Sequence, residues 1–142
     1  MFTAELGRGA VLNGAPVKVS SADSLGRGML CTGFPYDVHE SADNNLEHFN
    51  NFIKVARAIR RDGSAALDLC YVAMGRFDGF WEMKLKPWDI AAGFLVVTES
   101  GGKVTGFDGT PLELTRGEVL ASNSLIHEEM VKIFSLGRHI DK

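Results

Sequence analysis

The sequence predicts an α/β fold in which a mostly parallel sheet is flanked by helices and preceded by a β-hairpin. Two observations predict this class. Short apolar runs that suit buried strands alternate along the chain with longer segments of helical spacing. Near the N-terminus, the pair Asn13-Gly14 separates two apolar runs, which is the usual pattern of a two-residue hairpin turn. The 142 residues are enough for one hydrophobic core.

The first half of the chain carries signals for the hairpin, one strand and two helices. Asn13 and Gly14 tolerate the positive φ angles of a type I′ turn. Apolar residues from Leu46 to Ala56 recur close to the helical period. Ser64 is a typical helix N-cap, and Gly75 is a typical residue at which a helix stops. These signals predict a hairpin at 11–19, a strand at 28–33, and helices at 44–59 and 64–74.

The second half carries three strands and two helices. Asp89 can cap a helix because its carboxylate accepts hydrogen bonds from orphan backbone N–H groups. Pro87 keeps the chain extended just before that cap. Asn123 or Ser124 can cap the last helix. These signals predict strands at 79–83, 102–105 and 119–122, a turn at 107–111, and helices at 89–100 and 125–134.

Composition and cysteine usage exclude several classes of protein. The net charge is −3 and no dense basic block occurs, so no direct nucleic-acid partner is expected. The longest apolar run, at 90–97, is too short to span a bilayer, and residues 1–5 lack the features of a signal peptide. A cytoplasmic protein without a membrane partner is therefore expected. Cys31 and Cys70 lie far apart and outside any CxxC frame, which predicts buried, reduced thiols.

Three segments carry the clearest chemical signal. Residues 87–93 read PWDIAAG and are followed by Glu99-Ser100-Gly101-Gly102; residues 63–70 read GSAALDLC, and residues 75–82 read GRFDGFWE. A carboxylate held rigidly at a helix start, as Asp89 is, suits a hard cation. Together these segments resemble the inositol monophosphatase family, the Mg²⁺-dependent, lithium-sensitive sugar phosphatases. The resemblance runs from Phe2 to Phe134.

The resemblance implies the C-terminal half of the layered α-β-α-β-α sugar phosphatase fold. Family members are nearly twice this long, and their N-terminal half carries a Glu-Glu pair and an Asp-Pro-Ile-Asp-Gly-Thr type motif, neither of which occurs here. Residues 1–20 are then expected to be a hairpin remnant of the missing N-terminal domain, and residues 21–142 the C-terminal α/β domain. Since family members are commonly dimers, a homodimer or other self-association is expected.

The same resemblance assigns roles to four residues. Asp89 matches a ligand of Mg²⁺, and Glu82 matches a residue that hydrogen-bonds a substrate hydroxyl. Gly63 and Ala65 match positions that contact substrate. From local sequence alone each has a plainer interpretation: a helix cap, an exposed strand-end acid and a loop before a helix. Arg60-Arg61 facing a phosphate is a weaker hypothesis.

The remaining polar residues have structural interpretations. Asp68 lies on the apolar side of its helix and is expected to have a structural hydrogen-bond partner. No GxSxG motif occurs, and Ser64 has no evident base. The histidines have no metal-binding spacing and are expected at the surface or at caps; they are His39, His48, His127 and His139.

The resemblance implies an inositol-1-monophosphatase-like, Mg²⁺-dependent phosphate monoester hydrolase. This chain would supply one metal ligand and the side that binds a sugar or inositol phosphate, with no catalytic residue of its own and no activity alone. Two alternatives stay open. One is a fructose-1,6-bisphosphatase or nucleotide 3′-phosphatase of the same superfamily. The other is a non-catalytic interaction module, because a bacterial homologue in the family associates with the transcription antitermination machinery.

Overall fold

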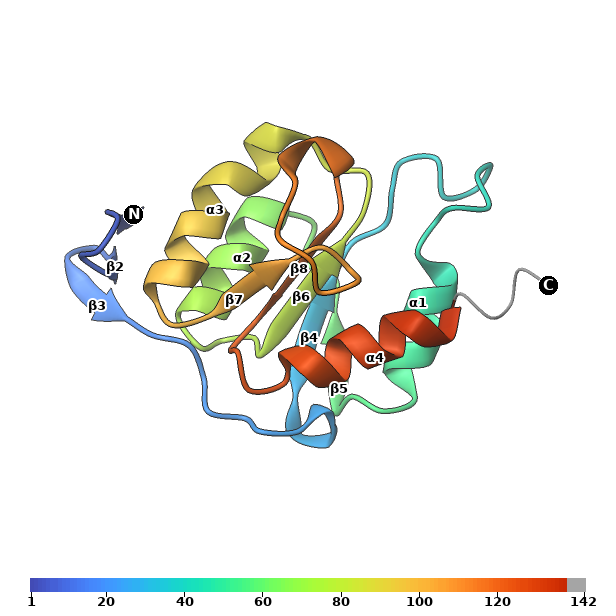
Figure 1. Cartoon of the computed structure of the whole chain (residues 1–142), viewed down its shortest axis with the longest axis horizontal. Coiled ribbons are helices and arrows are strands. Elements are labelled where there is room, and N and C mark those ends of the chain that lie inside the picture. The colour runs from blue at the N-terminus through green and yellow to red at the C-terminus, as the bar shows by residue number, and fades with distance from the viewer. Residues whose placement is uncertain (138–142) are drawn as a thin grey trace.

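A five-stranded sheet forms the centre of the protein, and the computed structural model describes residues 1–137 (Figure 1). The strand order is β5-β4-β6-β8-β7. β4 pairs in parallel with β5 and β6, whereas β8 is antiparallel to both β6 and β7. Four strands therefore run in the same direction, as predicted, and only β8 is reversed. The strands are β4 (Met29–Thr32), β5 (Ala58–Arg60), β6 (Gly79–Glu82), β7 (Lys103–Thr105) and β8 (Val119–Ser122).

Two helices cover each face of this sheet (Figure 1). α2 (Ala65–Ala73) and α3 (Pro87–Glu99) lie on one face, and α1 (Leu46–Ile53) and α4 (His127–Gly137) lie on the other. Because neighbouring side chains of a strand point to opposite faces, Phe80 is buried under α2 and α3 while Trp81 stacks on the α1 side. Two short 3₁₀ helices complete the structure, η1 (Leu25–Arg27) and η2 (Leu114–Arg116).

A small antiparallel sheet lies against α3 on the side away from the main sheet (Figure 1). Its strands are β1 (Phe2–Ala4), β2 (Ala10–Leu12) and β3 (Ala15–Val17), in that order. The predicted hairpin is confirmed, with φ of 51° at Asn13 and 85° at Gly14. β1 was not predicted. Phe2 packs edge-on against Tyr71 of α2, so this sheet adds a layer to the same core.

The helix caps agree well with the sequence prediction. The Ser64 hydroxyl accepts a hydrogen bond from the Leu67 N–H at the start of α2, and the helix is followed by Gly75 with φ of 82°. At the start of α4, the side-chain oxygen of Asn123 accepts hydrogen bonds from two backbone N–H groups, those of Leu125 and Ile126. These local signals act over three residues or fewer, which is why sequence alone identifies them.

Two of the differences at helix boundaries have a clear physical reason. The helix predicted at 44–59 ends at Ile53, and residues 58–60 instead form β5, because they find a parallel partner in β4. Ile59 packs into the core on the α1 side from this strand, so tertiary pairing overrides the helical spacing. α3 begins at Pro87 rather than Asp89, since proline is well suited to the first helical position.

The prediction for His127 was also wrong. This residue is 1% exposed, and its ring nitrogens lie 2.8 Å from Thr105 Oγ1 and 2.7 Å from Ser122 Oγ. Burial lowers the pKa of His127 to about 4, so the neutral ring ties α4 to β7 and β8 at neutral pH. His48 is half-buried, with its ring against those of Phe107 and Phe134.

Other sequence predictions have mixed outcomes. His39 is exposed as expected, and His139 lies outside the described residues. Both cysteines are free thiols, but only Cys31 is fully buried, whereas Cys70 is half-buried. Among residues 1–137, no helix combines the length and the apolar character needed to cross a bilayer. The division of the chain at residue 20 stays a prediction.

Candidate active site

A cavity of about 660 Å³ opens at the carboxyl ends of the parallel strands. Three segments line it: residues 33–37 after β4, residues 61 and 63–66 after β5, and residues 82–86 and 89 at and beyond the end of β6. Ligands of open α/β sheets commonly bind at this edge, because loops from several strands converge there. The four site residues predicted from sequence all line this cavity: Gly63, Ala65, Glu82 and Asp89.

Two helices point their N-termini at the cavity. α2 begins at Ala65 and α3 at Pro87, and both segments lie in its wall. The helices pack closely because Gly93 has no side chain: a Cβ atom there would lie 2.5 Å from Leu69 Cδ1. Helix N-termini present unpaired N–H groups and a partial positive charge, which favour an anionic ligand such as a phosphate.

One oxygen of the Asp89 carboxylate accepts a backbone hydrogen bond, and the other accepts none from the described residues. Asp89 is the third residue of α3, and its Oδ2 accepts a hydrogen bond of 2.9 Å from the backbone N–H of Lys86. It therefore caps the helix from inside the first turn, not from the N-cap position that the sequence predicted. Oδ1 accepts no hydrogen bond from any described residue, which leaves it available to a cation in the cavity.

Glu82 lies at the end of β6, with its carboxylate packed directly on Gly33. A Cβ atom at position 33 would collide with Glu82 Oε1, so a glycine is required there. Burial, with a smaller contribution from the carboxylates of Asp68 and Asp89, raises the pKa of Glu82 to about 7, while Arg61 opposes the shift. A cation or a hydroxyl donor placed beside Glu82 favours its ionised form.

A buried hydrogen-bond network positions Gly33, and sequence analysis missed it. Asn45 donates from Nδ2 to the Gly33 carbonyl (2.8 Å) and to Thr32 Oγ1 (3.1 Å), while its Oδ1 accepts from Trp81 Nε1 (2.7 Å). Thr32 Oγ1 in turn donates to the Trp81 carbonyl at 2.6 Å. The partners of Asn45 are 12 to 36 residues away in sequence, so no local pattern identifies it.

Charges of both signs line the cavity. The acids are Asp37, Glu82 and Asp89, and the cations are Arg61, Lys84 and Lys86. Lys84 Nζ lies 2.9 Å from Asp37 Oδ2, which joins the β4 and β6 segments. Carboxylates suit a metal ion and cations suit a phosphate, so the cavity is equipped for both. Of the predicted arginine pair, Arg61 lines the cavity while Arg60 is paired with Asp62, at 3.8 Å.

The structural role predicted for Asp68 was wrong in one respect. The residue is 1% exposed, as expected for the apolar side of α2, but neither carboxylate oxygen has a hydrogen-bond partner among the described residues. Burial raises the pKa of Asp68 to about 6.

Comparison with known proteins decides the family. The model of the inositol monophosphatase family matches residues 1–137. The chain belongs to the inositol monophosphatase family. It is 45% identical over 130 residues to an inositol-1-monophosphatase of Synechocystis, covering 92% of this chain and 45% of that protein. It is 42% identical to the Nus factor SuhB of Escherichia coli (strain K12), covering 92% of this chain and 49% of that protein.

Solved structures of the family have the same fold. An inositol monophosphatase from Anabaena (Nostoc) sp. matches with a TM-score of 0.93 and 44% identity, covering 95% of this chain and 54% of that one. The α/β fold class predicted from the sequence is therefore confirmed. The chain spans about half the length of the relatives it matches.

Proposed function

We propose that this chain forms the substrate side of a Mg²⁺-dependent phosphate monoester hydrolase that acts on inositol phosphate or a related sugar phosphate. One observation carries the proposal: Gly63, Ala65, Glu82 and Asp89 come from three parts of the sequence and line one cavity. Two helix N-termini face the same space. The names of the relatives, which include inositol-1-monophosphatase, agree with this chemistry.

Asp89 fits the role of metal ligand. Its Oδ2 is held by the Lys86 N–H, so the side chain has a fixed orientation, and Oδ1 has no competing hydrogen bond in the described residues. Mg²⁺ takes six oxygen ligands, so one carboxylate is an incomplete site, and we infer that water, substrate and a further polypeptide segment supply the rest. When bound, such a metal polarises the phosphate and makes water a better nucleophile.

Glu82, Gly63 and Ala65 are proposed to hold the sugar. An ionised carboxylate accepts hydrogen bonds from polyol hydroxyls with charge-assisted strength. Gly63 has open space around its Cα atom, which allows a ligand to approach the backbone closely. Ala65 opens α2, so N–H groups of the first turn are available to oxygen atoms of the ligand.

A chimera tests this proposal. In it, the chain replaces the matching segment of the Synechocystis inositol-1-monophosphatase. The chain alone should release negligible phosphate from inositol 1-phosphate, because it has one predicted metal ligand and nothing to position the attacking water. The chimera should show Mg²⁺-dependent turnover that a chelator abolishes. Robust chelator-sensitive turnover by the purified chain alone would contradict the half-site proposal, as would a folded chimera without activity.

A second candidate function is a non-catalytic interaction module. Similarity to several proteins named Nus factor SuhB favours it, at 42–46% identity. A folded but inactive chimera would support this candidate. Activity restricted to fructose 1,6-bisphosphate or to nucleotide 3′-phosphates would instead assign the chain to another substrate class of the superfamily.

We further propose that the chain self-associates, in the cytoplasm. β1 and β3 are the outer strands of the small sheet, and each pairs on one side only within residues 1–137. Open strand edges template association. Large apolar side chains are also exposed, among them Leu6 (81%) and Trp88 (78%). Sedimentation velocity over a wide concentration range should give a rising weight-average coefficient. A concentration-independent monomer would rule this out.

A further inference from the structure

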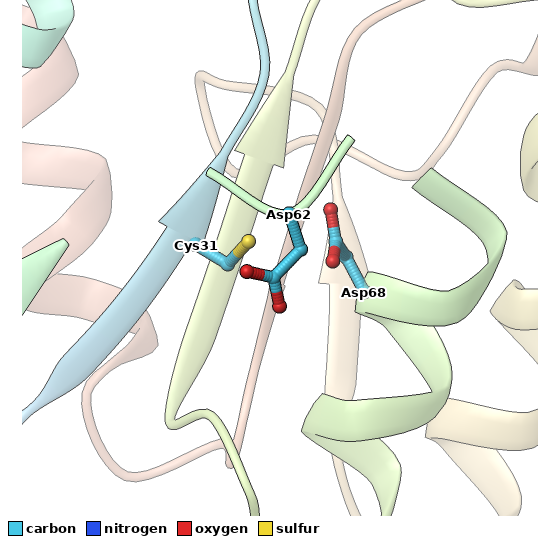
Figure 2. A group of neighbouring side chains, drawn as sticks. All are labelled: Cys31, Asp62 and Asp68. Atoms are coloured by element: carbon cyan, nitrogen blue, oxygen red, sulfur yellow. The ribbon is translucent and has the colours of Figure 1, made fainter. Parts of the chain in front are cut away.

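A second group of potential metal ligands comes from residues that do not line the cavity (Figure 2). Cys31 is on β4, Asp62 is in the loop between β5 and α2, and Asp68 is in the first turn of α2. The Cys31 sulfur and one carboxylate oxygen of each aspartate all lie within 4.8 Å of one another. Figure 2 shows the thiol and the two carboxylates gathered around one small space, although they come from three segments of the chain.

The state of Asp68 independently points to a ligand in this space. Its side chain is 1% exposed, yet both carboxylate oxygens are without a hydrogen-bond partner among residues 1–137. Burying an ionised carboxylate without a partner costs several kcal/mol, so buried acids are normally hydrogen-bonded, paired or bound to metal. The other two groups of the cluster are the Cys31 thiol, which is only a weak hydrogen-bond donor, and the Asp62 carboxylate, which has no proton to donate when it is ionised. A cation satisfies all three groups at once.

We propose that Cys31, Asp62 and Asp68 bind a divalent cation of borderline softness, for which Zn²⁺ is the best match. Zn²⁺ binds thiolate at about 2.3 Å and carboxylate oxygen at about 2.0–2.2 Å, which places tetrahedral ligands about 3.5 Å apart. The three ligand atoms lie within 4.8 Å of one another, so binding requires them to close in by up to about 1.3 Å relative to that ideal separation. Asp62 is in an exposed loop, which leaves it free to move. Three protein ligands leave the fourth position to water.

This site differs chemically from the one at Asp89. A thiolate ligand selects zinc-like ions against Mg²⁺, which prefers oxygen ligands only. Burial raises the pKa of the Cys31 thiol to about 12, so the thiol is protonated when no cation is present and its proton passes to solvent on binding. The bound ion would tie the loop before Gly63 to β4 and α2. The inference does not depend on the proposed phosphatase activity.

Cobalt spectroscopy of the 142-residue chain tests the inference, since Co²⁺ replaces Zn²⁺ and reports a thiolate ligand through a near-ultraviolet charge-transfer band. Titration of the reduced chain should produce that band at one equivalent, and Zn²⁺ should abolish it while Mg²⁺ should not. Cys31→Ser should remove the band, and Cys70→Ser, the matched control, should keep it. Asp89→Asn should also keep it.

Asp62→Asn guards against misfolding as an explanation, because Asp62 is exposed and its replacement leaves the core intact. It should weaken Co²⁺ binding by at least about tenfold, since even groups that only orient a ligand contribute 10–100-fold to metal affinity. The inference is overturned if the reduced chain gives no thiolate band, if the band survives Cys31→Ser, or if Asp62→Asn binds Co²⁺ as tightly as the unaltered chain.

Discussion

Asp89→Asn should lower the Mg²⁺-dependent turnover of the chimera by about a hundredfold or more, the usual loss when a group that stabilises transition-state charge is removed. The amide keeps the size of the side chain, and its oxygen can still accept the Lys86 N–H that now bonds Oδ2. The start of α3 should therefore be preserved. What is lost is the negative charge at Oδ1. The measurement is kcat on inositol 1-phosphate at saturating Mg²⁺, with thermal unfolding as the folding check.

Asp37→Asn is the matched control for that experiment. Asp37 also lines the cavity, but its carboxylate is paired with Lys84 at 2.9 Å at a partly exposed position. Partly exposed pairs of this kind contribute on the order of 1 kcal/mol or less to stability, so the variant should stay folded. Because the Asp37 carboxylate is already paired with Lys84, its replacement should change the rate little. If both variants lost the same activity, general loss of negative charge in the cavity would explain the result, and Asp89 would have no special role.

Glu82→Gln should change substrate discrimination more than rate. On inositol 1-phosphate, kcat/KM should fall about tenfold or more, because loss of one charge-assisted hydrogen bond costs roughly 1.5–3 kcal/mol. On a simple aryl phosphate, which has no sugar hydroxyl to offer, kcat/KM should change little. Equal losses on both substrates would exclude a role for Glu82 in sugar recognition.

Gly33→Ala provides a second variant that leaves the carboxylate in the protein. The new Cβ would lie 2.2 Å from Glu82 Oε1, far inside contact distance, and must push the side chain out of place. The network through Asn45 holds the Gly33 backbone, so the side chain of Glu82 must give way. We expect kcat/KM to fall on inositol 1-phosphate but not on an aryl phosphate, as for Glu82→Gln. If Gly33→Ala behaves like the unaltered chimera, the sugar binds elsewhere.

Local signals predicted much of this fold. Asn13-Gly14, Ser64 and Asn123 act through contacts within three residues, so sequence alone identified the hairpin turn and two caps. Residues 58–60 show the limit of that approach. Their spacing continues the helical pattern, but their hydrogen-bond partner is β4, almost 30 residues earlier. A pattern read within one window cannot weigh that pairing.

The residues that line the candidate site could be predicted from the sequence, but the residues that position them could not. The resemblance identified Asp89 and Glu82, and the topology explains why they lie close together: Glu82 ends β6, and Asp89 is in the first turn of the helix that follows. Gly33 and Asn45 were missed because their roles depend on atoms of Glu82 and Trp81 that are distant in sequence. Asp68 was correctly predicted to be buried, but its lack of a hydrogen-bond partner depends on the tertiary structure and cannot be read from the sequence.

A crystal structure of the chimera with inositol 1-phosphate and Ca²⁺ in place of Mg²⁺ tests the central claim most directly. The account predicts a cation within about 2.3–2.6 Å of Asp89 Oδ1, the normal range for Ca²⁺ and oxygen. It also predicts a ring hydroxyl within hydrogen-bonding distance of the Glu82 carboxylate and the ring against Gly63 and Ala65. A cation bound without Asp89, or a sugar that leaves this cavity empty, would contradict it.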